Sequence, residues 1–151
     1  MPIVKFVNKS YMKKTDMMNL LFYIVERAVY VSGFGISTDL TESVFCEFEY
    51  AKRFWNKAEE GRRQVRHLVV IFENPKLSLD SVCEMAWKIA AIYGNRFQVF
   101  YGVHMDTGYP HVHFAINTVS FIDGRMYSEG YADLQILKKH ISIITHSYEH
   151  I

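Results

Sequence analysis

The stretch His104-Met-Asp-Thr-Gly-Tyr-Pro-His-Val-His113 holds three of the seven histidines of the chain, and it decides how the neighbouring segments fold. Apolar residues precede it at 97–103 and follow it at 114–116, as expected for strands. The Asp, Gly and Pro between the histidines favour a turn. We therefore predict strands at 97–104 and 111–121, joined as an antiparallel hairpin.

The same hairpin would bring the three histidines together. His111 and His113 are two residues apart, so on a strand both point to one face, with Cα atoms roughly 6–7 Å apart. His104 ends the preceding strand and would lie beside them. A lone histidine is usually a satisfied polar group, but three histidines with an aspartate and a turn favour a metal site. Imidazoles suit several transition metals, and three protein ligands leave positions open for a substrate.

On either side of the hairpin, apolar periodicity and capping residues predict the other elements. They are a strand at 3–8, helices at 15–28 and 40–60, a strand at 67–72, and helices at 78–93 and 133–148. The glycine-bearing segment 31–36 is expected to be a connector, and the polar segment 61–64 to be exposed. The order β-α-α-β-α-β-β-α predicts an α+β fold in which helices flank a central antiparallel sheet.

Length and composition narrow the class of protein. A chain of 151 residues, half of them apolar, is expected to form one globular domain over 1–151. It is compatible with a complete protein or with the N-terminal part of a longer one. No apolar run reaches the roughly 18 residues of a membrane span, and no signal-peptide core is present. Cys46 and Cys83 form no CxxC pair and fit a reducing compartment, so we expect a cytoplasmic protein.

The charge of the chain leaves nucleic-acid binding open. The formal net charge of +1 neither supports nor excludes it, because binding depends on local patches. Two clusters of basic residues are present, near the start of the chain and before the strand at 67–72: Lys5, Lys9, Lys13 and Lys14, and Arg62, Arg63 and Arg66. Any single residue of this kind is most often part of a solvated face. As groups, however, they are candidates for contacts with DNA phosphates.

Tyr23 is a candidate for a second functional element. The helix predicted at 15–28 has a polar stripe opposite an apolar face: Asp16, Asn19, Tyr23 and Arg27 against Met17, Leu20 and Ile24. Tyr23 therefore need not be a core aromatic, although an ordinary amphipathic position is the commoner case. Tyr30 competes for the same role. A phenol is a poor nucleophile at its free pKa of about 10. A divalent cation beside the phosphate would assist it by stabilising the charge that develops.

Several motifs together resemble one family. They are Leu21-Phe-Tyr23-Ile24, Val31-Ser-Gly-Phe-Gly35, His67-Leu-Val-Val-Ile-Phe72, His104-Met-Asp106-Thr107 with His111-Val-His113 and Asn117, and Ser120-Phe-Ile-Asp-Gly-Arg125-Met-Tyr127. In this order the chain resembles mobilisation-type relaxases of the HUH endonuclease superfamily over about residues 3–148. The histidine motif is the most specific part of the resemblance, and the tyrosine motif is the least specific.

The resemblance implies an enzyme that nicks and joins DNA at an origin of transfer. It implies that Tyr23 attacks the DNA and stays on the 5′ phosphate. It further implies that His104, His111 and His113 hold Mg²⁺ or Mn²⁺, while Asp106 orients a ligand or accepts a proton. His67 and Asn117 would support the ligands from a second shell. The implied partners are single-stranded or hairpin DNA, contacted by Arg27 and the two basic clusters, and accessory DNA-binding proteins, with no membrane insertion.

Two other functions remain open from the sequence. A non-catalytic relative would bind single-stranded or hairpin DNA through basic residues and aromatic stacking, for which Tyr11, Phe34, Tyr109 and Tyr127 are candidates. A metallohydrolase would use a metal-bound water and form no covalent intermediate. A covalent adduct between protein and DNA distinguishes the relaxase from both.

Overall fold

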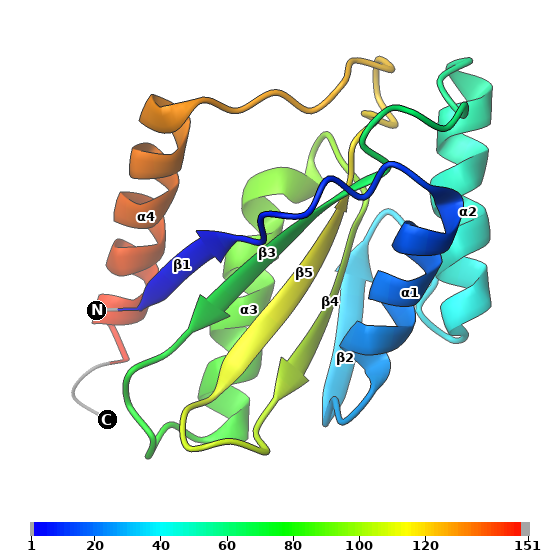
Figure 1. Cartoon of the computed structure of the whole chain (residues 1–151). Coiled ribbons are helices and arrows are strands. Elements are labelled where there is room, and N and C mark those ends of the chain that lie inside the picture. Colours follow the sequence, from blue (N-terminus) through cyan, green and yellow to red (C-terminus); the bar gives the residue numbers. More distant parts are fainter. Residues whose placement is uncertain (1, 149–151) are drawn as a thin grey trace.

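The computed structural model describes residues 2–148, in which nine elements are arranged around one sheet (Figure 1). The strands are β1 (Ile3–Phe6), β2 (Tyr30–Phe34), β3 (Val65–Ile71), β4 (Val99–His104) and β5 (His111–Asn117). The helices are α1 (Lys14–Val25), α2 (Thr41–Phe54), α3 (Leu79–Gly94) and α4 (Tyr131–His146). The strands lie in the order β1-β3-β5-β4-β2, and all neighbours are antiparallel. The predicted α+β class is confirmed.

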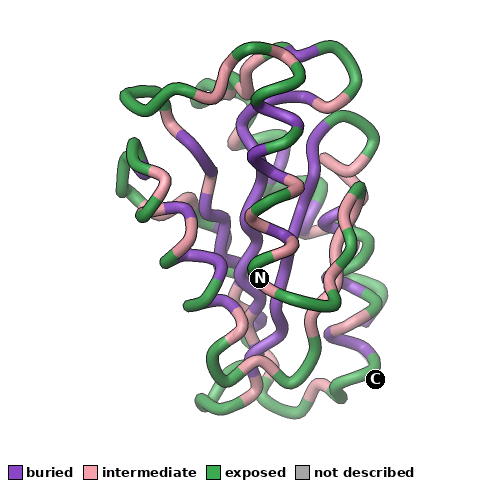
Figure 2. Tube along the Cα trace, turned by 90° about the vertical axis from the view of Figure 1, so that its right-hand side faces the viewer, coloured by how far each residue is buried: buried purple, intermediate pink, exposed green. Residues whose placement is uncertain are grey.

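Helices cover both faces of the sheet. Helices α1 and α2 lie on one face, and α3 and α4 lie on the other (Figure 1). Because side chains alternate along a strand, each central strand supplies both cores. Toward α3 and α4 the core includes Leu68, Val112, Phe114, Met85 and Ile141; toward α1 and α2 it includes Phe100, Ala115, Leu21, Ile24 and Phe48. Burial is accordingly continuous along the central strands, while the turns at their ends are exposed (Figure 2).

One local prediction is wrong, and another is wrong in part. The segment 31–36 was expected to be a connector, but Tyr30–Phe34 forms the edge strand β2 and pairs with β4. Its glycines weaken the strand pattern, whereas the close approach of the β4 backbone at Gly33 requires a glycine. The segment 61–64 was expected to be exposed; Gly61 and Arg62 are exposed, but Gln64 is buried and bonds to the carbonyls of Glu59 and Arg62. The other predicted elements are present with shifted ends.

The helices leave part of the first face open. Helix α1 packs over β4 and β5, whereas the same face of β1 and β3 lies beside the helix without a helix above it (Figure 1). Ile3 and Lys5, which point to this face, are exposed. Within residues 2–148, no helix is both long and apolar enough to cross a membrane. The strip of sheet beside α1 is therefore the part of this face, next to the histidines, that no helix covers.

Candidate metal centre and its surroundings

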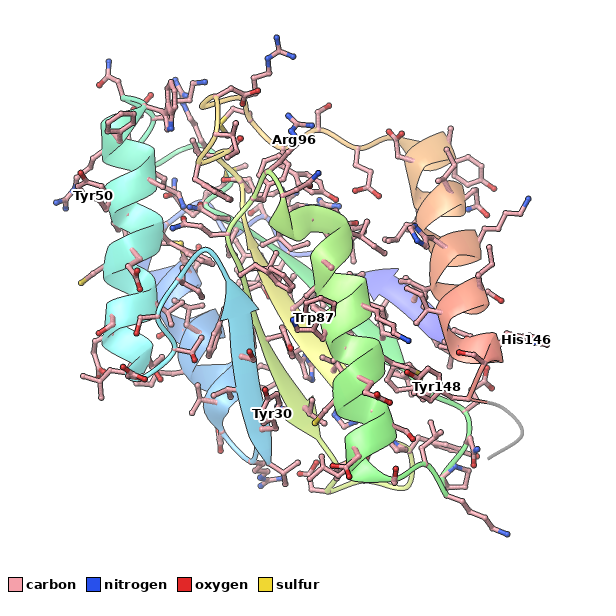
Figure 3. The ribbon with its side chains drawn as sticks, turned by 180° about the vertical axis from the view of Figure 1, so that it is seen from behind. Tyr30, Tyr50, Trp87, Arg96, His146 and Tyr148 are labelled. Carbon is pink, nitrogen blue, oxygen red and sulfur yellow. The ribbon has the colours of Figure 1, made fainter. Side chains whose placement is uncertain are left out.

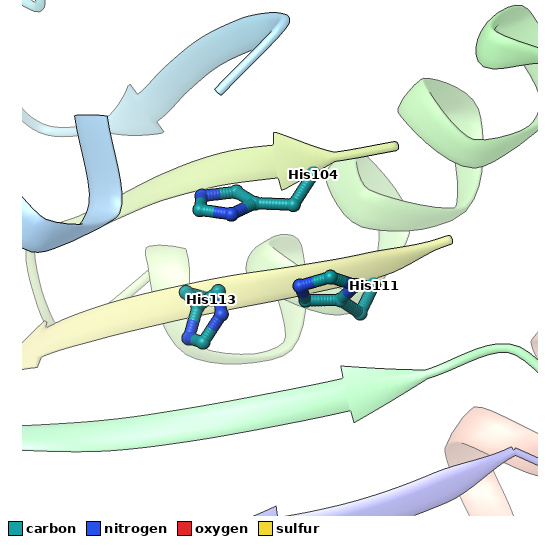
Figure 4. A group of neighbouring side chains, drawn as sticks. All are labelled: His104, His111 and His113. Carbon is teal, nitrogen blue, oxygen red and sulfur yellow. The ribbon is translucent and has the colours of Figure 1, made fainter. Parts of the chain in front are cut away.

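The structure brings the three predicted ligands together on the face that α1 covers (Figure 4). His104 lies directly opposite His111 in the β4–β5 register, and His113 lies opposite Gly102. One ligand nitrogen from each ring lies within 4.8 Å of the others. This is the arrangement expected from the spacing of two on β5 and from the hairpin that pairs His104 with it.

Each histidine has one nitrogen held by the protein and one left for an ion. His104 Nε2 donates to the Ile24 carbonyl at 2.8 Å, and His111 Nδ1 donates to the Tyr109 carbonyl at 3.1 Å. His113 Nδ1 lies 2.8 Å from Nε2 of His67. Metal-binding histidines are usually fixed in this way, through a hydrogen bond from the nitrogen that does not bind the ion. The available atoms, Nδ1 of His104 and Nε2 of His111 and His113, therefore fit a divalent cation.

Burial keeps the centre of this cluster uncharged. Burial, together with the neighbouring rings of His67, His104 and His111 and the Lys5 cation, lowers the pKa of His113 to about 3. Burial, followed by the Lys5 cation, lowers the pKa of His67 to about 4. Both rings are therefore neutral near pH 7 and keep the lone pairs that metal binding requires. His67, on β3, is thus in direct contact with His113.

Tyr23 lies against the histidine cluster. Its ring makes edge contacts with His113, at 5.2 Å between centroids, and with His67, at 6.3 Å. The side chain is 52% exposed, although Ile24 beside it is fully buried. Gly102 allows this close approach of α1, because a Cβ there would lie 2.8 Å from the Ile24 carbonyl oxygen.

Tyr30 lies on the other side of the sheet. It is paired with Val103, whose side chain belongs to the core beneath α3. Paired residues point to the same face of a sheet, so Tyr30 faces away from His104, the next residue along β4. Figure 3 shows Tyr30 from the side that α3 covers. The structure thus brings Tyr23, and not Tyr30, to the histidines.

Asp106 lies near the cluster but does not orient its ligands. Its carboxylate is 3.7 Å from the Arg27 guanidinium, at a cavity of about 350 Å³ that Tyr23 and His111 also line. Among the described residues, no hydrogen bond joins Asp106 to a ligand histidine, and the backbone of Ile24 orients His104 instead. Asp106 therefore shares this cavity with Tyr23 and fixes none of the three rings through a hydrogen bond that the described residues show.

Tyr23 also lines a second, larger groove. It has a volume of about 670 Å³ and occupies the open strip above β1 and β3. Its lining is mixed, with Lys5 and Lys9, Tyr11 and His67, and the apolar side chains of Leu20, Val69 and Ile71. Lys5 belongs to the first predicted basic cluster, and alternation along 3–8 puts it on one face with Ile3 and Val7. Tyr11 was considered from the sequence for stacking alone, because its hydrogen-bond partner, His67, is 56 residues away.

The predicted basic clusters do not form one surface. Lys9 lines the groove, and Lys13 is exposed at the start of α1. Lys14 instead pairs with Glu49 at 2.7 Å and donates to Gln64 at 2.8 Å. Arg27 is exposed and borders the smaller cavity.

The three arginines of the second cluster have different partners. Arg62 pairs with Glu59 at 2.7 Å, and Arg63 donates to the Lys9 carbonyl at 2.7 Å. Arg66 stacks on Phe6 on the face opposite His67, because consecutive strand residues alternate. Arg66 therefore does not face the groove.

Asn117 lies away from the cluster, although the sequence motif suggested a supporting role. It is four residues beyond His113 on β5, roughly 13 Å along the strand. Its amide nitrogen donates to the Phe48 carbonyl at 3.1 Å and to Gln98 at 2.8 Å, and its oxygen accepts from Lys52. Asn117 therefore joins α2 to the sheet, and its assignment as a supporting residue of the metal ligands is corrected.

Of the four aromatic residues proposed for stacking, only Tyr109 is exposed beside the cluster. Tyr11 is 5% exposed, so its ring face is covered. Phe34 contacts Trp87 and Tyr127 contacts Tyr93, both on the face of α3. Tyr109 is exposed in the β4–β5 loop, two residues before His111.

Comparison with known proteins agrees with this geometry. A family model described as relaxase, MobA/VirD2-like, nuclease domain, matches residues 23–150. The match covers well over half of the chain and includes Tyr23 and all three ligand histidines. No curated protein matches the chain.

Proposed function

The chain belongs to the MobA/VirD2-like relaxase family, and we propose that it nicks and rejoins one DNA strand through a covalent phosphotyrosine on Tyr23. The observation that carries the proposal is the contact of the exposed Tyr23 ring with His113, in a cluster whose free nitrogens converge. A site for binding alone would need neither the convergent ligands nor a phenol beside them. The family as a whole supports DNA nicking, and the tyrosine chemistry is our assignment.

In the proposed reaction the Tyr23 oxygen bonds to the phosphorus of a DNA phosphodiester, and the bond from phosphorus to the 3′ oxygen breaks. Asp106 accepts the phenol proton in the cavity that it shares with Tyr23. The 3′ oxygen takes a proton from solvent water and leaves as a hydroxyl, while the 5′ phosphate stays on Tyr23. A second strand end with a 3′ hydroxyl reverses these steps and restores a phosphodiester.

His104, His111 and His113 would hold the divalent ion through the nitrogens that the protein leaves available. We propose Mg²⁺ or Mn²⁺. When bound, the ion polarises a phosphoryl oxygen and stabilises the charge that develops during transfer. The nitrogens that would bind it are Nδ1 of His104 and Nε2 of the other two rings.

The proposed substrate is single-stranded DNA or the strand beside a hairpin. Lys5 and Lys9 would bind phosphates in the larger groove, and its apolar side chains would contact bases. Tyr23 lines both cavities, so a strand crossing from one to the other would pass the phenol. We propose that this occurs in the cytoplasm at an origin of transfer, in mobilisation or conjugative transfer of a plasmid or integrative element, with accessory DNA-binding proteins.

The test is a search for the covalent adduct. The protein is incubated with short single-stranded oligonucleotides and Mn²⁺, and a denaturing gel resolves the protein–DNA species. Tyr23→Phe should abolish the adduct while folding and metal binding persist, because only the attacking oxygen is removed. The matched control, Tyr30→Phe, should still form it. Soluble cleaved product without adduct would instead support a metallohydrolase, and DNA binding without cleavage would support a non-catalytic relative.

A further inference from the structure

A buried hydrogen-bonded chain leads from the metal ligands to Tyr11. Nδ1 of His113 lies 2.8 Å from Nε2 of His67, and Nδ1 of His67 lies 2.9 Å from the hydroxyl of Tyr11. His67 and Tyr11 are each 5% exposed, so water is poorly placed to replace either partner. The chain therefore links the ion site to the loop between β1 and α1 through side chains alone.

The direction of the hydrogens in this chain decides whether His113 can bind an ion. A neutral imidazole has one N–H and one lone pair. If Tyr11 donates to His67, then His67 Nε2 donates to His113, and the hydrogen of His113 sits on Nε2, where the ion would bind. If the chain runs the other way, His113 donates to His67, His67 donates to the Tyr11 oxygen, and Nε2 of His113 is free.

Only the second direction is compatible with metal binding, and it requires an acceptor beside Nδ1 of His67. The Tyr11 hydroxyl supplies that acceptor, since a hydroxyl can donate or accept. Its own hydrogen is then available to the groove, which Tyr11 also lines. Without this oxygen, the second direction would leave a buried N–H of His67 with no partner, which is unfavourable.

The backbone at Tyr11 indicates that this position is strongly determined. Tyr11 has a φ of 50°, in the left-handed region that side chains other than glycine seldom occupy. Its carbonyl accepts from the Gln64 backbone N–H at 2.8 Å, and the Lys9 ammonium lies 5.2 Å from its ring centroid. Strain of this kind persists where the surroundings hold a residue in place, often near functional sites.

We propose that Tyr11 is a positioning residue that fixes the hydrogens of His67 and thereby makes His113 a competent metal ligand. This inference rests on the metal site of the proposed function. It concerns the placement of hydrogens on neutral rings and involves no change in their total charge. It predicts that the Tyr11 oxygen matters for metal affinity although it contacts no metal ligand directly.

The experiment measures metal binding and histidine hydrogens in the whole chain. Titration calorimetry with Mn²⁺ should give an affinity about 10–100-fold weaker for Tyr11→Phe than for the unmodified protein, as for other losses of outer-shell partners. Nitrogen NMR of the unmodified protein loaded with diamagnetic Mg²⁺ should find the hydrogen of His67 on Nδ1. The matched control is Tyr101→Phe, a buried tyrosine on the face of α3, which should bind Mn²⁺ normally.

The two measurements test the role of Tyr11 separately from the existence of the metal site. A Tyr11→Phe affinity within twofold of the unmodified protein, or a hydrogen on Nε2 of His67 in the loaded protein, would overturn the role of Tyr11 and leave the metal site standing. Absence of Mn²⁺ binding in the unmodified protein would overturn both. Should Tyr11→Phe fail to fold, the NMR measurement on the unmodified protein still decides between the two directions.

Discussion

Replacing Gly102 by alanine should move α1 away from the histidines without changing any side chain of the site. A Cβ at Gly102 would lie 2.8 Å from both the carbonyl oxygen and the Cγ2 atom of Ile24, and 3.3 Å from the Cβ of Ala28. Comfortable contact between carbons begins at about 3.5 Å, so α1 would have to move outward by roughly 0.7 Å. The backbone of Ile24 cannot rotate away as a flexible side chain can.

The size of the effect follows from two consequences of this shift. Overpacking of this kind costs about 1–3 kcal/mol, which in a chain of this length lowers Tm by roughly 2–12 °C. The hydrogen bond from His104 to the Ile24 carbonyl, now 2.8 Å, would lengthen to roughly 3.5 Å, beyond the normal range. Since that bond holds the hydrogen of His104 on Nε2, Mn²⁺ affinity should fall about 10–100-fold.

The assay combines thermal unfolding with Mn²⁺ calorimetry. Gly108→Ala is the matched control, because a Cβ there meets nothing within 4 Å. It should leave both Tm and affinity unchanged. A folded Gly102→Ala protein with normal Tm and normal Mn²⁺ affinity would refute the reasoning, since α1 would then not set the position of His104.

Three further outcomes are expected from other parts of the molecule. Removing the ion with a chelator should stop adduct formation, and His111→Ala should abolish the rise in Tm that Mn²⁺ produces while changing the Tm of the metal-free protein little. Lys5→Gln should reduce the slope of log affinity for single-stranded DNA against log salt by about 0.7, since one phosphate contact is lost, whereas Lys139→Gln on the exposed side of α4 should not. Burial lowers the pKa of Lys52 from 10.5 to about 7. Between these values the unfolded chain binds more protons, so the free energy of unfolding should rise from pH 7 to pH 10 in urea titrations, and Lys52→Met should flatten that rise. An equally steep rise in Lys52→Met would assign it to another group.

Much of the fold could be predicted because it is local. The hairpin around Gly108 and the apolar stripes of the helices are set by residues close in the chain, and they gave the α+β class. Strand β2 could not be predicted in the same way. Its glycines weaken the strand pattern, and its strand conformation depends on pairing with β4, about 70 residues later.

Which of Tyr23 and Tyr30 lies beside the histidines also depends on the tertiary structure. Both tyrosines lie close together in the sequence, and nothing in their local patterns separates them. The β2–β4 register puts Tyr30 on the face of α3, while Gly102 lets α1 bring Tyr23 to His113. The roles predicted for Asn117 and Arg66 were wrong for a related reason. A position on a strand does not specify which neighbouring residue the side chain contacts.

The sequence by itself determined that His104, His111 and His113 would converge, because strand alternation and a short hairpin are properties of adjacent residues. Only the tertiary structure decided what surrounds them: Tyr11 and His67 behind His113, Ile24 behind His104, and Lys5 along the open groove. Those partners come from segments up to 80 residues away. Their contacts are fixed by strand order and helix packing, which no local pattern specifies.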